Sequence, residues 1–99
     1  MGVLHLVSRS PYASSDLSNC LARLQPGDAL LLLAGAVYGA CHGSPIADAI
    51  LASPAACYVL IPDLKARGIA MEKILPEITP VDFEGFVDLT VAYSRILSW

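Results

Sequence analysis

Continuous apolar runs, rather than alternating polar and apolar residues, mark the strands that this chain predicts. The clearest run covers residues 29–34; Pro26-Gly27-Asp28 precedes it and Gly35 follows it. Two further runs cover residues 3–7 and 57–61. A strand that is apolar at every position must be covered on both faces, as strands in parallel sheets of α/β proteins are. The three runs therefore predict a compact parallel sheet with helices on its faces.

Segments of helical length connect these runs. The first predicted helix begins near Ser14, Ser15 or Asp16 and reaches about residue 24, because its apolar residues form a single stripe at helical spacing. A second helix is expected from Pro45 to about residue 52. A third begins at Asp63 as its N-cap and stops before Gly68. The segment 35–44 between the second strand and the second helix is rich in small residues and is expected to be a loop.

The last third of the chain predicts one short strand and one long helix. Two prolines place the segment around residues 77–81 at an edge of the sheet, because proline cannot donate to a sheet ladder. Asp82 then caps a helix that runs nearly to Trp99 and is apolar around most of its circumference, which indicates more than one packing neighbour. This order of elements predicts one domain over residues 1–99. Its fold is an α/β three-layer sandwich with a mostly parallel sheet, of the flavodoxin-like type.

The composition indicates a surface that other proteins cover. Hydrophobic residues make up 56% of the 99 residues and charged residues only 15%, whereas about 25% charged is typical. A domain of this size has a small core and cannot hide so much apolar material alone. Because large bare apolar patches mark interaction sites, we expect other subunits to cover them.

Several classes of function are disfavoured by the sequence. The longest nearly unbroken apolar stretch, residues 29–41, contains two glycines and is shorter than the roughly 20 residues of a membrane-spanning helix. No signal peptide is recognisable, so a cytoplasmic location is expected. The net charge of -3 and the scattered basic residues argue against direct binding of nucleic acid.

Cofactor and metal sites are not expected either. No glycine pattern typical of a nucleotide-binding loop follows any predicted strand. The three cysteines are an odd number without the spacing of a disulfide framework or a zinc site. His5, Cys41 and His42 together provide too few ligands for structural zinc.

A set of landmarks occurs in a fixed order along the chain. They are Leu4-His5-Leu6-Val7-Ser8-Arg9-Ser10-Pro11, Pro26-Gly27-Asp28-Ala29-Leu30-Leu31-Leu32, Tyr58-Val59-Leu60, Asp63-Leu64 with Ala66-Arg67-Gly68, Val81-Asp82-Phe83 with Phe86-Val87 and Leu89-Thr90, and Trp99. Through these landmarks the chain resembles the DsrH/TusB family of sulfur-relay proteins over essentially its whole length. The resemblance implies the fold of the DsrE-like superfamily.

The resemblance also implies partners. It implies a dimer of heterotrimers with DsrE/TusD-like and DsrF/TusC-like subunits, which receives sulfur from a donor protein and passes it to an acceptor as a cysteine persulfide. One branch of the family serves 2-thiolation of the tRNA wobble uridine and the other serves cytoplasmic sulfur oxidation. The principal sulfur-accepting cysteine belongs to the DsrE/TusD-like partner, so this chain would be a small accessory subunit. Homo-oligomers are an alternative when the partners are absent.

Cys20 is the candidate persulfide carrier, and any catalysis by this chain would be limited to that role. Some DsrH-like members carry a cysteine in the first helix, which favours the sulfur-oxidising branch. Persulfide transfer requires an accessible thiolate, yet Cys20 lies on the apolar stripe of its helix, as a core cysteine would. A purely structural subunit is therefore the alternative. Cys41 is expected to be an incidental loop residue and Cys57 a core residue.

Phe86 and Trp99 are the candidate interface residues. Tryptophan is enriched at protein interfaces, and the apolar excess of the chain favours this role over that of a core anchor for Trp99. A third hypothesis, a free-standing flavodoxin-like module that binds a small ligand, rests on the topology alone.

Overall fold

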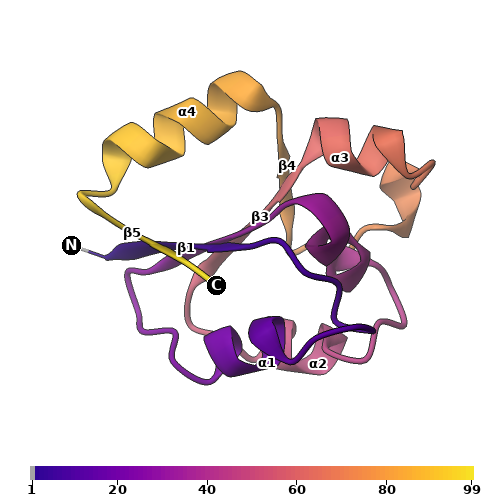
Figure 1. Cartoon of the computed structure of the whole chain (residues 1–99), viewed down its shortest axis with the longest axis horizontal. Helices are drawn as coiled ribbons and strands as arrows, with labels where there is room; N and C mark the ends of the chain where they lie inside the picture. Colours follow the sequence, from indigo (N-terminus) through magenta and orange to yellow (C-terminus); the bar gives the residue numbers. More distant parts are fainter. Residues whose placement is uncertain (1) are drawn as a thin grey trace.

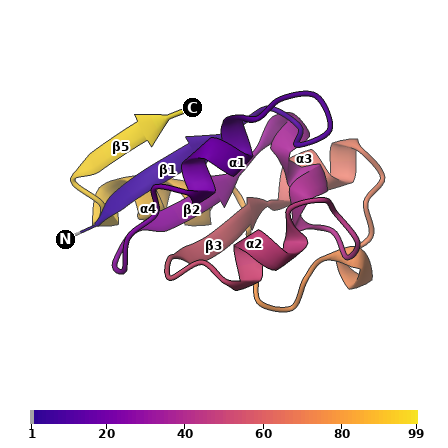
Figure 2. The ribbon, with the colours of Figure 1, turned by 90° about the horizontal axis from the view of Figure 1, so that it is seen from below.

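A five-stranded, all-parallel sheet forms the centre of the computed structural model, which describes residues 2–99. Across the sheet the order is β4-β3-β2-β1-β5, and in Figure 1 the sheet crosses the middle of the molecule between the helices. The strands are β1 (Val3–Val7), β2 (Ala29–Leu32), β3 (Ala56–Leu60), β4 (Thr79–Val81) and β5 (Arg95–Ser98). Figure 2 shows β5, β1, β2 and β3 side by side. The predicted α/β sandwich with a parallel sheet is confirmed.

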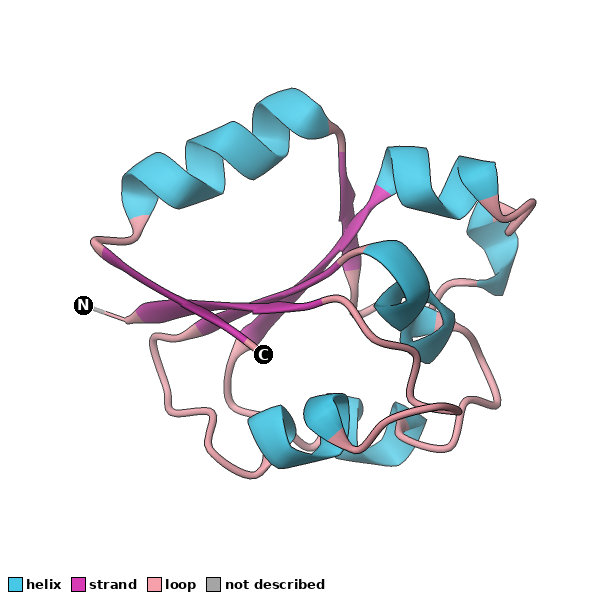
Figure 3. Cartoon of the chain, viewed as in Figure 1, coloured by secondary structure: helices cyan, strands magenta, loops and turns pink. Residues whose placement is uncertain are grey.

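Helices lie on both sides of the sheet (Figure 3). They are α1 (Asp16–Leu21), α2 (Ala47–Leu51), α3 (Ile61–Ala66) and α4 (Phe83–Ala92), with 3₁₀ helices η1 (Ala34–Ala40) and η2 (Met71–Lys73). In Figure 1, α4 lies on one side of the sheet, and α1 and α2 lie on the other. None of the helices in residues 2–99 has the length and apolar character needed to cross a membrane.

The two faces of the sheet carry separate apolar clusters of very different size. The larger cluster takes Val7, Leu30 and Val59 from the strands and joins them to buried residues of α1, η1, α2 and α3. The smaller cluster centres on Leu4 and Leu31, against which half-buried side chains of α4 pack. Side chains alternate between the two faces along a strand. Because both faces of β2 are covered by these clusters, every residue of β2 is buried. This arrangement explains the continuous apolar runs in the sequence.

The prediction that the last helix runs from Asp82 nearly to Trp99 is wrong. Helix α4 ends at Ala92, Tyr93 is extended (φ -107°, ψ 124°), and β5 pairs in parallel with β1 from Val3↔Arg95 to Leu6↔Ser98. No glycine or proline separates α4 from β5. The apolar residues of β5 therefore looked like a continuation of the helical pattern, and the strand was missed.

The second neighbour expected around α4 is not supplied by residues 2–99. One side of the helix packs on the sheet through Phe86 and Leu89. The opposite side leaves Phe83, Val87 and Val91 exposed, with 81% of Val91 accessible. In β5, Ile96 is exposed as well and, as the strand partner of Leu4, lies on the α4 side of the sheet. Leu97 is also exposed, but it is the partner of His5 and points to the other face. We call Phe83, Val87, Val91 and Ile96 the α4–β5 surface.

Several local expectations are confirmed and others are corrected. Asp82 caps α4, since its Oδ1 accepts the Gly85 N–H at 2.8 Å, and Gly68 with φ +67° follows α3. The edge position of β4 is also confirmed. Asp63, however, is not an N-cap, because α3 already begins at Ile61 with proline in its first turn. The expected loop 35–44 is largely the helix η1.

Candidate functional site

Cys20 lies near the end of α1 and is completely buried, with 0% of its surface exposed. It belongs to the larger core cluster. Burial raises the pKa of its thiol to about 12, and the neighbouring Cys57 and Asp28 add to that rise. The reactive form of a cysteine is the thiolate, so in this conformation Cys20 is neither accessible nor ionised at neutral pH.

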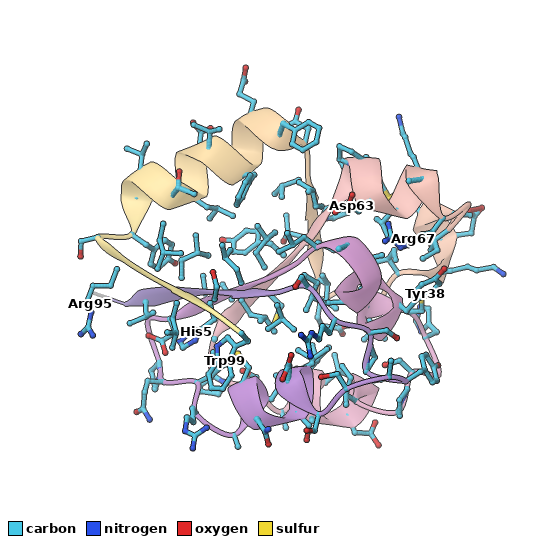
Figure 4. The ribbon with its side chains drawn as sticks, in the orientation of Figure 1. His5, Tyr38, Asp63, Arg67, Arg95 and Trp99 are labelled. Atoms are coloured by element: carbon cyan, nitrogen blue, oxygen red, sulfur yellow. The ribbon has the colours of Figure 1, made fainter. Side chains whose placement is uncertain are left out.

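A polar network that the sequence did not predict lies in the same region. His5 in β1 places Nε2 3.2 Å from Oδ2 of Asp28, and the indole N–H of Trp99 donates to Nδ1 of His5 at 3.1 Å. His5 and Asp28 are buried. Figure 4 shows His5 and Trp99 next to each other, away from Tyr38, Asp63 and Arg67.

The geometry fixes which nitrogen of His5 carries the proton. An indole N–H can only donate, so Nδ1 of His5 must be the unprotonated acceptor. Nε2 then carries the hydrogen and donates to Asp28. Because both ring nitrogens are already occupied, neither is hydrogen-bonded to a thiol, and His5 does not act as a base for Cys20 in this arrangement.

Asp28 is the centre of the network. Its carboxylate also accepts the backbone N–H of Val3 at 2.9 Å and that of Gln25 at 3.0 Å. Burial alone would raise its pKa, but the hydrogen bonds from Val3, Gln25 and His5 outweigh that effect and lower the pKa below its ordinary value. Asp28 therefore stays charged and joins the start of β1 to the turn before β2.

The other cysteines lie in different environments. Cys57 is in β3 and nearly buried, and burial raises its pKa to about 11, which confirms the predicted core position. Cys41 follows η1 and is only partly buried. Burial raises the pKa of Cys41, whereas the charge of Lys73 lowers it. His42 beside it is exposed.

Phe86 and Trp99, the candidate interface residues, are both half-buried against the chain's own core. Phe86 packs on the smaller cluster and Trp99 on the larger one. The guanidinium of Arg23 lies 5.7 Å from the centre of the Trp99 ring. An interface role for these two residues stays a prediction, and each also anchors its own element.

At the carboxyl edge of the sheet a carboxylate holds a strained backbone. Ala34, the first residue of η1, has φ +48°, a conformation that costs a residue with a side chain about 1 kcal/mol or more. Oδ2 of Asp63 accepts its N–H at 2.6 Å. No group of three His, Cys, Asp or Glu side chains suited to a metal occurs among residues 2–99.

These features define a small all-parallel α/β protein whose candidate thiol is enclosed by its own core. Residues 9–96 match the family model described as "DsrH like protein", and the chain belongs to this family. It is 41% identical over 97 residues to Protein TusB of Pectobacterium parmentieri, and the aligned region covers 98% of this chain and 100% of the relative. It is also 38% identical over 97 residues, with the same coverage, to Protein TusB of Shigella flexneri.

A solved structure supports the fold. The crystal structure of the ychN protein from E. coli superposes with a TM-score of 0.78 and covers 100% of both chains. Its sequence is only 16% identical, so this likeness concerns the architecture alone.

The environments of the three cysteines predict an order of reactivity. In the native chain Cys41 should react first with a small thiol reagent, and Cys20 and Cys57 at least about a hundredfold more slowly, because burial excludes the reagent and suppresses the thiolate. Peptide mapping after timed labelling measures the three rates. In denaturant all three should react alike, and native labelling of Cys20 as fast as that of Cys41 would contradict the structure.

The network around Asp28 predicts sensitivity to acid. Since the folded pKa of Asp28 lies below its ordinary value of about 4, its carboxylate stabilises the fold above that value, and the stabilisation disappears as the pH falls through the lower folded pKa. Asp28→Asn should lower the free energy of unfolding by roughly 1–3 kcal/mol at neutral pH. Below about pH 4 the free energy of unfolding of this variant should fall less steeply with decreasing pH than that of the native protein. Urea unfolding at several pH values tests this, with the exposed Asp88→Asn as control. Equal effects of both substitutions would refute the role of Asp28.

Proposed function

We propose that this chain is a structural subunit of a cytoplasmic sulfur-relay complex. In this proposal it assembles with DsrE/TusD-like and DsrF/TusC-like subunits, and the persulfide travels through a cysteine of the DsrE/TusD-like partner. Membership of the DsrH-like family supports the proposal. The observation that carries the structural role is the complete burial of Cys20.

The α4–β5 surface supports assembly. It places four exposed apolar side chains on the outer face of α4 and on the edge strand β5. Exposed apolar surface of this kind marks protein interaction sites. The outer edge of β5 also carries no neighbouring strand within residues 2–99, and an unpaired edge offers main-chain hydrogen bonds to a partner.

The position of Cys20 supports a structural rather than a sulfur-carrying role. A persulfide carrier must present its sulfur atom to two other proteins in turn. Cys20 is surrounded by core residues of α1, α2 and the sheet, and its thiol has no hydrogen bond to a base among residues 2–99. Persulfide carriage by Cys20 stays a prediction, and it would require local opening around α1.

We infer that the complex serves 2-thiolation of the tRNA wobble uridine rather than sulfur oxidation. Curated relatives at about 40% identity over the full chain are named TusB, and the resemblance connects TusB with the tRNA branch. Cys20 alone favours the other branch, but a cysteine buried in this way is explained by packing.

A genetic complementation experiment tests this function. Deleting the gene in its own host should reduce 2-thiouridine in tRNA, measured by nucleoside mass spectrometry, because the relay would lose a subunit. A gene encoding Cys20→Ser should restore 2-thiouridine to near the original level. Normal thiolation in the deletion strain would overturn the proposed function. Failure of a folded Cys20→Ser protein to restore thiolation would favour the persulfide carrier instead.

The α4–β5 surface predicts which substitutions prevent assembly. Val87→Asp and Val91→Asp should weaken co-purification with the two partner subunits roughly tenfold or more, because a carboxylate would be buried in an apolar interface. Both side chains are exposed in the isolated chain, so its thermal unfolding should change little. Leu51→Asp is the matched control, because Leu51 is an exposed apolar residue of α2 on the opposite side of the sheet. Assembly unchanged by the α4 variants, or equally impaired by Leu51→Asp, would refute this interface.

A further inference from the structure

Trp99 is held against the molecule by a few specific contacts. Its backbone N–H donates to the Leu6 carbonyl at 2.9 Å and so extends the pairing of β5 with β1. Its indole N–H donates to Nδ1 of His5, and Arg23 lies over its ring. The side chain thereby closes over the larger core cluster, although the strand before it, β5, is exposed throughout.

The hydrogen bond between Trp99 and His5 depends on the charge of the imidazole. It requires a free lone pair on Nδ1, which exists only while His5 is neutral. When a solvent proton binds Nδ1, the atom becomes a donor and faces the indole N–H, which is also a donor. Nε2 still donates to Asp28. Protonation of His5 therefore removes the hydrogen bond to Trp99 and keeps the one to Asp28.

We propose that His5 and Trp99 form a proton-operated latch on the end of β5. Neutral His5 accepts the indole N–H and keeps Trp99 packed on the core. Protonated His5 releases it and loosens the edge strand that carries Ile96 and Leu97. The latch involves only residues of this chain, so it can be tested independently of the proposed complex.

Several charged and titratable groups lie around the latch. His5 is hydrogen-bonded to Asp28 and to Trp99, over whose ring lies Arg23, just after α1. Cys20 of α1 and Cys57, in the same row of the sheet as His5, belong to the larger core cluster on this face. Arg95 lies in β5 two positions before Leu97, the strand partner of His5, whereas Tyr93 packs on the smaller cluster on the opposite face. The Asp28 carboxylate attracts an imidazolium, whereas the two arginines oppose it. The pKa of Asp28 is lowered by its hydrogen bonds despite burial. Burial raises the pKa of Cys20, Cys57 and Tyr93, so these groups do not change charge between roughly pH 5 and pH 8, where histidine does.

The native chain itself offers the first test, by nitrogen NMR of its two histidines. At about pH 8, where histidine is ordinarily neutral, His5 should be the tautomer with hydrogen on Nε2. On acidification to about pH 5, His5 should gain a proton, and the indole N–H of Trp99 should lose protection from hydrogen exchange roughly five- to tenfold, as expected for one lost hydrogen bond. His42, which is exposed, is the internal reference.

Tryptophan fluorescence provides the matched comparison, because Trp99 is the single tryptophan of the chain. Its emission should change with pH in the native protein and in the control His42→Asn. In His5→Asn the change should vanish, since the asparagine side-chain oxygen can accept the indole N–H but does not titrate. The wild-type NMR experiment remains decisive if His5→Asn does not fold.

Three results would each overturn the latch. The first is a neutral His5 with hydrogen on Nδ1. The second is a His5 that never gains a proton above about pH 5, or one that does so without any loss of indole protection. The third is a pH-dependent fluorescence change that persists in a folded His5→Asn protein.

Discussion

The buried carboxylate of Asp28 is the interaction on which the arrangement of β1, β2 and β5 depends. It accepts hydrogen bonds from Val3 at the start of β1 and from Gln25 in the turn before β2. Through His5 it also reaches Trp99, 94 positions away from that histidine in the sequence. A buried charge is tolerated only when hydrogen bonds or opposite charges compensate for its lost hydration. Here the compensating donors come from separate segments, so the same carboxylate fixes their relative positions.

The unequal covering of the sheet connects the fold with the proposed function. On one face, α1, α2, η1 and α3 enclose a large cluster that contains Cys20. On the other face, α4 covers the sheet with one side and exposes apolar residues on its other side. The interior is thus complete where the candidate thiol lies, whereas the α4–β5 surface lies on the opposite side of the sheet. A subunit that binds partners without exposing a reactive thiol has this distribution of surface.

Much of the fold could be predicted because the signals were local. Continuous apolar runs identified β1, β2 and β3, prolines identified the edge strand β4, and Asp82 marked the start of α4. The change from α4 to β5 could not be predicted, because no glycine or proline separates them and the apolar positions of residues 93–97 fit both helical and strand spacing. The role of Asp63 was misjudged for a similar reason: its partner, Ala34, is 29 positions away.

The candidate site was less predictable than the fold. The apolar stripe of α1 indicated correctly that Cys20 could be a core residue. The network of His5, Asp28 and Trp99 joins residues that are 23 and 94 positions apart, and no local pattern connects them. One signal was present, since a histidine within an apolar strand requires a buried hydrogen-bond partner. The identity of that partner depended on the tertiary structure.

The most direct measurement for the account is sulfur mapping in the assembled complex. The co-purified subunits would be exposed to a persulfide donor, and intact-mass spectrometry with peptide mapping would then locate the added sulfur. We expect the sulfur on the DsrE/TusD-like partner and none on the peptide of this chain that contains Cys20. Added sulfur on that peptide, absent in Cys20→Ser, would contradict the structural role and make this subunit a carrier in the relay.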